Sequence, residues 1–173
     1  DMLPTDVNPF TTVVTHLHFG RTDVPVDVAA EFTFFQANEW KHLANGAKHI
    51  RELTERLIPG FDVDQLHKQV NALRRRSEER LGPALGSLLG QKHVFPSLST
   101  ELLKRYVSSD LSDTSTEETE VYSDIVKAAD LYFTSNDFGF PTTIIDTPGT
   151  NDPFLIRDEI ARRALESAHV HVV

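Results

Sequence analysis

The sequence lacks cysteine altogether, has no long apolar run and is short of basic residues. Without cysteine the chain forms neither a disulfide framework nor a thiolate metal site, a composition that fits a reducing cytoplasm. No stretch approaches the ~20 consecutive apolar residues that span a bilayer. Lysine and arginine number 17 against 26 aspartates and glutamates, which gives a formal net charge of −9. Because nucleic-acid binding needs an excess of basic side chains, this balance argues against a nucleic-acid partner.

What remains is the composition of one globular domain. Hydrophobic residues make up 39% of the 173 positions and charged residues 25%, which is ordinary for a domain that buries a core. The fold class we expect is α/β, with strands in the first and last thirds of the chain and helices between them.

β-Branched and aromatic residues near the N-terminus indicate two strands. Residues 12–19 alternate apolar with polar side chains, and residues 29–35 follow after a turn at 20–23, the pattern of half-buried strands. Since the two strands are close in sequence, we expect them to form a hairpin with a long loop.

The middle of the chain, about 38–90, has helical periodicity and is expected to form an inserted helical subdomain. Breaks at Pro59-Gly60 and Gly82-Pro83 divide it. A polar stretch at 108–120 has the composition of a flexible loop. The expected helices are 39–57, capped by Asn38; about 62–81, capped by Asp62 or Asp64; and 100–107, beginning at Ser99-Thr100.

The last third returns to strands. Residues 122–134 are expected to be extended, although 125–130 are also compatible with a helix. Residues 142–146 are expected to form a short buried strand, followed by a helix that opens at Pro153 and a final strand at 168–173. Strand, helix and strand would make a βαβ unit with two parallel strands. Because the final alternating run ends at Val173 without a turn, we expect the chain to be a fragment.

The segment with the most chemistry is the run from Thr143 to Gly149, TIIDTPG. An apolar strand delivers Asp146 to its carboxyl end, where ligands bind in open α/β sheets. An aspartate there is suited to hold Mg²⁺, usually through water. Gly149 has no Cβ, so its N–H can approach a γ-phosphate closely. Asp-Thr-Pro-Gly is also an ordinary turn, but the strand before it and the helix expected after it favour a phosphate-sensing switch.

Two segments of this sequence resemble those of bacterial dynamin-like GTPases. The stretch from Phe138 to Val173 is similar to the second switch of that family, here at 143–152, and LPTDVNPFTTVVT at 3–15 is similar to the first. The resemblance covers about residues 1–20 and 95–173. It implies a partial P-loop GTPase-type sheet that binds GTP and Mg²⁺ and hydrolyses GTP to GDP.

The resemblance also implies roles for individual residues. Asp146 would be the aspartate on the Mg²⁺ side, and Gly149 would contact the γ-phosphate, with Thr147 and Pro148 in the same signature. Thr11 would place its hydroxyl on Mg²⁺ and help to fix the attacking water. Phe10 and Val13 depart from the usual PTTA pattern, so Thr12 is an alternative to Thr11.

Two motifs of the family are absent from the sequence. No GxxxxGKS/T segment occurs, and no TKxD or NKxD segment follows the last strand. The first motif supplies most of the phosphate binding, and in the family it would precede Asp1. We therefore expect the chain alone to bind nucleotide poorly. The family further implies self-association through the GTPase domain and membrane remodelling, hence a cytoplasmic protein that associates peripherally with membrane lipids.

Two other functions compete with the GTPase hypothesis. A degenerate GTPase domain would act as a non-catalytic scaffold or dimerisation module. A metal protein is the second, because His16 and His18 share one strand face, as do His169 and His171. A four-histidine site is less expected than exposed strand histidines, since the sequence places no carboxylate at ligand spacing beside either pair.

Overall fold

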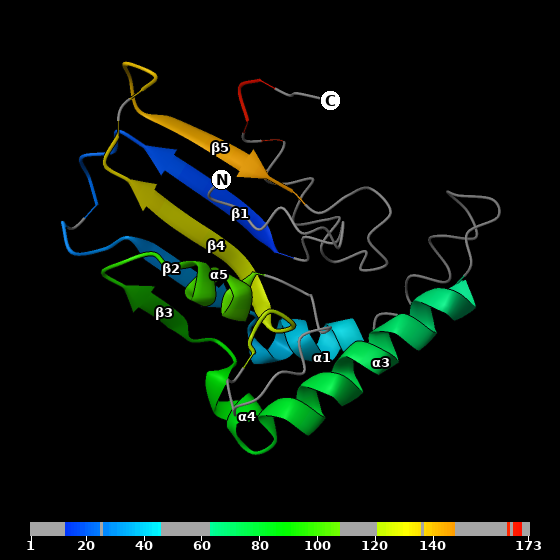
Figure 1. Ribbon diagram of the computed structural model, residues 1–173. Coiled ribbons are helices and arrows are strands. Elements are labelled where there is room, and N and C mark those ends of the chain that lie inside the picture. The colour runs from blue at the N-terminus through cyan, green and yellow to red at the C-terminus, as the bar shows by residue number, and fades with distance from the viewer. Residues whose placement is uncertain are drawn as a thin grey trace.

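The computed structural model describes residues 13–24, 26–45, 63–107, 121–135, 137–147, 166 and 168–170. Over these ranges the chain is a mixed α/β fold in which helices pack against one open, five-stranded sheet (Figure 1). The strands are β1 (Val14–Phe19), β2 (Ala30–Phe34), β3 (Lys92–Phe95), β4 (Val126–Phe133) and β5 (Thr142–Asp146). The helices are α1 (Ala37–Asn45), α3 (Val63–Leu81), α4 (Ala84–Leu88) and α5 (Thr100–Tyr106).

The strand order across the sheet is β3-β2-β4-β1-β5. The central strand β4 runs parallel to β1 and antiparallel to β2, while β5 runs antiparallel to β1 at one edge. The expected hairpin between 12–19 and 29–35 is therefore wrong, although both strands form. The physical reason is that β4 can pair along both of its edges and bury Ala129 and Leu131 between the two neighbours.

The pairing register separates the side chains onto two faces, because partners on neighbouring strands point to the same side. Thr15 lies opposite Ala129, and Ala129 lies opposite Phe32. All three are fully buried, so this is the core face. One residue further along the strands, His16, Asp130 and Glu31 form a row on the opposite face, which is polar and only half-buried.

Aromatic side chains fill the core face and attach α5 to β2. The rings of Phe32 and Tyr106 stack with centroids 4.2 Å apart, and Phe34 lies in the same cluster beside Tyr122. Helix α5 begins at Thr100 as expected, and Ser99 caps it, since the Ser99 hydroxyl accepts a hydrogen bond from the backbone N–H of Leu102 at 3.1 Å. This cap lets a helix of only seven residues begin where the core needs Leu102, Leu103 and Tyr106.

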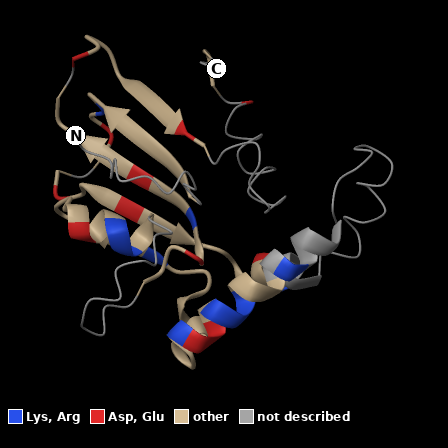
Figure 2. Cartoon of the chain, turned by 45° about the vertical axis from the view of Figure 1, so that its right-hand side comes forward, with Lys and Arg blue, Asp and Glu red and all other residues tan. Residues whose placement is uncertain are grey.

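Helix α3 spans the region expected to be helical and ends at Leu81, and the next residue, Gly82, has a φ of +46° that suits glycine. Leu73 and Leu81 join the same core as the sheet. Figure 2 shows charges of both signs along α3, where Arg74 pairs with Glu78 at 2.7 Å and Arg75 with Glu79 at 3.5 Å. Arg74 and Arg75 therefore belong to a solvated face, as three consecutive arginines on a helix predict.

Arg76 differs from its two neighbours because it pairs with a buried carboxylate. Its Nε donates to Asp124 Oδ2 at 2.7 Å, and Arg80 lies 3.9 Å from the same carboxylate. The side chain of Asp124 is only 5% exposed. These ion pairs tie α3 to the turn that precedes β4, and a buried carboxylate without them would be costly.

Two expectations for the helices and extended segments are corrected. Asn38 lies inside the first turn of α1 rather than before it, because Glu39 reaches back to accept from the backbone N–H of Gln36 at 2.8 Å and so fixes the start. Residues 126–133 form β4, so the helical alternative over 125–130 is wrong. Apolar side chains two residues apart, Ala129 and Leu131, are buried on one face there.

Two expectations for the C-terminal third are also corrected. Strand β5 forms, but it is not buried: Ile144 is 43% exposed because β5 lies at the edge of the sheet. Residues 168–170 are not in a strand, and the described partner of β5 is β1, which is antiparallel. The expected βαβ unit is therefore not formed within the described residues.

Three expected features lie outside the part of the chain that the structure describes. They are the continuation of the first helix from 46 to 57, the polar loop at 108–120 and the helix opening at Pro153. None of the helices that the structure does describe is both long and apolar enough to cross a membrane.

Candidate functional site

The end of the sheet at which β5 terminates contains Asp146, the aspartate singled out by the sequence. Asp146 lies opposite Thr15, the second residue of β1. The chain thus enters β1 at the same end of the sheet at which it leaves β5. Val13 and Thr147, which are far apart in sequence, therefore lie at this same end.

Asp146 lies in a half-buried position on the core face, since its partner Thr15 is fully buried. Burial raises the pKa of the Asp146 carboxyl above its ordinary value. No residue in the described ranges offers it an ion pair or hydrogen bond. A cation would compensate for the lost solvation, so the position suits a group that binds one.

Thr147 is the only other member of the expected site that the structure describes, and it is half-buried directly after β5. Thr11, Thr12, Pro148 and Gly149 lie outside the described residues. The structure therefore places the adjoining residues Val13 and Thr147, and the roles expected of these four residues stay predictions.

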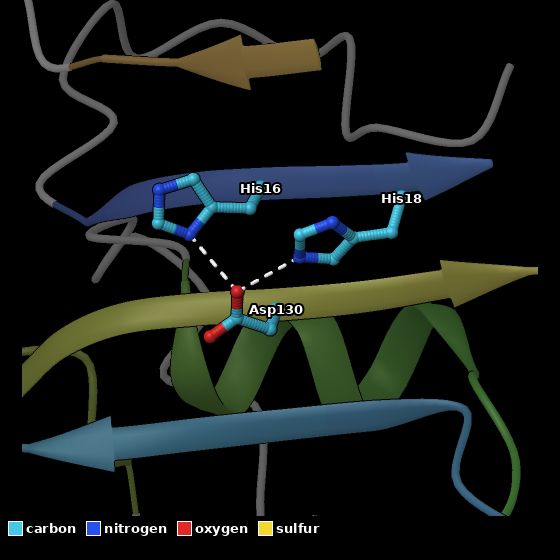
Figure 3. Close-up of side chains that lie close together, drawn as sticks. All are labelled: His16, His18 and Asp130. Atoms are coloured by element: carbon cyan, nitrogen blue, oxygen red, sulfur yellow. Dashed lines mark hydrogen bonds and ion pairs between the residues drawn. The ribbon is translucent and has the colours of Figure 1, made fainter. Parts of the chain in front are cut away.

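A second cluster occupies the polar face of the sheet and consists of His16, His18 and Asp130. Figure 3 shows the two imidazoles of β1 and the carboxylate of β4 pointing toward one another. His16 Nδ1 lies 3.0 Å and His18 Nε2 lies 2.9 Å from the same oxygen, Asp130 Oδ1. The three potential ligand atoms all lie within 4.8 Å of one another.

His18 is the most constrained member of this cluster. Its side chain is 8% exposed and stacks on Tyr132, with ring centroids 4.9 Å apart. Its second ring nitrogen, Nδ1, lies 2.9 Å from Thr143 Oγ1 of β5. The imidazole is thus held between strands on both sides of β1, with Nε2 directed at Asp130.

Electrostatics keep the carboxylate of the cluster ionised. Burial by itself raises the pKa of Asp130, but hydrogen bonds from His16 and His18 outweigh burial and hold this pKa well below its usual range. Next to it, burial together with the charges of Asp130 and Glu31 raises the pKa of Tyr132 to about 12. Asp130 is therefore an anion and Tyr132 a neutral phenol at physiological pH.

The sequence identified the two histidines of β1 but missed Asp130. The expectation that no carboxylate lies beside this pair is wrong, because the parallel pairing of β1 with β4 places Asp130 opposite His16. No local spacing could reveal a partner from a strand so distant in sequence. His169 is exposed and is not part of the cluster, and His171 lies outside the described residues.

Comparisons with protein families, with curated proteins and with solved structures find no match to this chain. The class that the structure defines is a mixed α/β fold with an open five-stranded sheet.

Proposed function

We propose that the chain is part of a dynamin-like GTPase that binds and hydrolyses GTP at the end of the sheet marked by Asp146. The observation that carries this proposal is the pairing of Thr15 with Asp146. It brings together the described parts of the two segments that resemble GTPase switches, residues 13–15 of 3–15 and residues 143–147 of 143–152. A ligand at that end could contact both segments together, as a phosphate-sensing mechanism requires.

The setting of Asp146 supports a role next to a cation. Its half-buried carboxylate has a raised pKa and no partner among the described residues, and a divalent ion would stabilise the ionised form. Mg²⁺, when bound, would supply positive charge that stabilises the negative charge developing on the transferred phosphoryl group. Asp146 would orient the water shell of that ion.

The remaining residues of the two segments would have positioning roles. Thr11, or Thr12 in its place, would orient the attacking water and provide a hydroxyl ligand. Gly149 would donate its backbone N–H to the γ-phosphate, with Thr147 and Pro148 shaping the turn. Loss of the Gly149 contact after hydrolysis would release the loop that follows Gly149. Self-association, contact with membrane lipids and residence in the cytoplasm are the further expectations of this proposal.

Titration of the whole protein with a fluorescent GTP analogue tests the proposal. We expect saturable, Mg²⁺-dependent binding that GTP and GDP compete away, and GTP turnover by the same sample. The 173-residue chain alone is expected to bind far more weakly, because its sequence contains no GxxxxGKS/T loop. Absence of any nucleotide binding by the whole protein would contradict the proposal and favour the non-catalytic scaffold.

A further inference from the structure

We propose that His16, His18 and Asp130 form a binding site for a divalent transition metal of the Zn²⁺ class. The site goes beyond the proposed GTPase function and is separate from it. Asp146 shares the core face of the sheet with Thr15, whereas His16 and Asp130 lie on the opposite face. One sheet would thus hold two cation sites of different chemistry, back to back.

Two of the three pairs of donor atoms have nearly the spacing that a metal requires, and all three donor atoms lie within 4.8 Å of one another. Zn–N and Zn–O bonds of about 2.0–2.2 Å at a tetrahedral ion place neighbouring ligand atoms ~3.4 Å apart. Asp130 Oδ1 lies 3.0 Å from His16 Nδ1 and 2.9 Å from His18 Nε2. Binding of an ion by these atoms would lengthen each of the two distances by only ~0.4–0.5 Å. The metal would take the place of the protons that now join the two imidazoles to the carboxylate.

The surroundings of His18 are those of a metal ligand. In metal sites a ligating imidazole usually donates its other ring N–H to an oxygen, which fixes the tautomer and the ring orientation. Thr143 Oγ1, 2.9 Å from His18 Nδ1, is placed to accept that hydrogen bond. The stack on Tyr132 holds the plane of the ring. Nε2 is then left with a lone pair directed at the cluster.

The donor set determines the class of ion. Two imidazoles and one carboxylate suit Zn²⁺ and its transition-metal neighbours, whereas Mg²⁺ and Ca²⁺ prefer oxygen ligands. Three protein ligands leave a fourth position open, as in zinc sites that hold water or a substrate oxygen. His16 and Asp130 each retain 24% side-chain exposure, so this position faces the accessible side of the cluster.

Zinc titration of the chelator-treated chain by calorimetry tests the site. We expect one ion per chain. His16→Gln and Asp130→Asn should each weaken binding by more than the roughly 10- to 100-fold that loss of an outer partner costs, and Thr143→Val should weaken it within that range. His169→Gln is the matched control, because this exposed histidine lies outside the cluster. The zinc affinity of the His169→Gln variant should equal that of the unsubstituted chain.

A second readout does not depend on any variant. Long-range ¹H–¹⁵N spectra of the unsubstituted chain should show zinc shifting His16 at Nδ1 and His18 at Nε2, the two nitrogens that face Asp130. Zinc that leaves these nitrogens unshifted, or that fails to bind stoichiometrically, would overturn the proposal. Affinity lost in His169→Gln and retained in Asp130→Asn would overturn it too, in favour of the four-histidine arrangement.

Discussion

Replacing Asp146 with alanine is expected to lower GTP turnover by the whole protein by roughly 100- to 1,000-fold, the loss typical of one preorganised charge-stabilising group. The structure describes the position of Asp146, at the end of β5 opposite Thr15. Without its carboxylate the bound ion would lose its orienting partner. Steady-state turnover at saturating GTP and Mg²⁺ measures the effect.

The fold should survive this substitution, which makes the loss of turnover interpretable. Burial raises the pKa of Asp146 in the folded chain. Above the unfolded pKa, the ionised carboxylate therefore costs stability instead of contributing it. At neutral pH, the loss of this buried charge should not make the metal-free Asp146→Ala variant less stable than the metal-free parent.

Asp137→Ala is the matched control, because this aspartate is exposed in the turn between β4 and β5. It removes the same charge close by in the sequence and should leave turnover unchanged. Equal turnover in the Asp146 variant and the parent would show that the carboxylate at the end of β5 has no part in hydrolysis.

Replacing Phe32 with alanine is expected to destabilise the fold by about 3–5 kcal/mol, the usual cost of deleting a buried aromatic side chain. Phe32 is fully buried at the middle of the core face and stacks on Tyr106 of α5. The cavity would loosen α5 from the sheet as well as remove buried area. Urea denaturation followed by circular dichroism gives the change in the free energy of unfolding.

Phe140→Ala provides the comparison for that substitution, because Phe140 is 65% exposed. Its effect should stay within about 0.5 kcal/mol, as for most surface changes. Equal effects of the two substitutions would mean that the sheet does not bury its Phe32 face against α5. The core described above would then be wrong.

Local structure was largely predictable from sequence, whereas the sheet topology was not. The alternation in 12–19 and 29–35 and the capping serine at residue 99 are local signals, and each predicted its element. The order of the strands depends on which edges pair. Strand β4 comes after both β1 and β2 in sequence, yet it lies between them.

The difference between local patterns and strand pairing also explains why the sequence revealed Asp146 but not Asp130. Asp146 is recognisable from the neighbouring sequence, an apolar strand pattern before it and Thr-Pro-Gly after it. Asp130 joins His16 and His18 across sequence separations of 114 and 112 residues. Only the parallel register of β1 and β4 brings these three side chains together.

Hydrogen exchange of the whole protein, with and without GTP and Mg²⁺, tests most directly whether both segments sense one nucleotide. We expect GTP with Mg²⁺ to slow amide exchange in 3–15 and 143–152 together, and GDP to slow it less. The β3 edge of the sheet, opposite β5 in the strand order, should be unaffected. Unchanged exchange in both segments at saturating GTP would contradict the account.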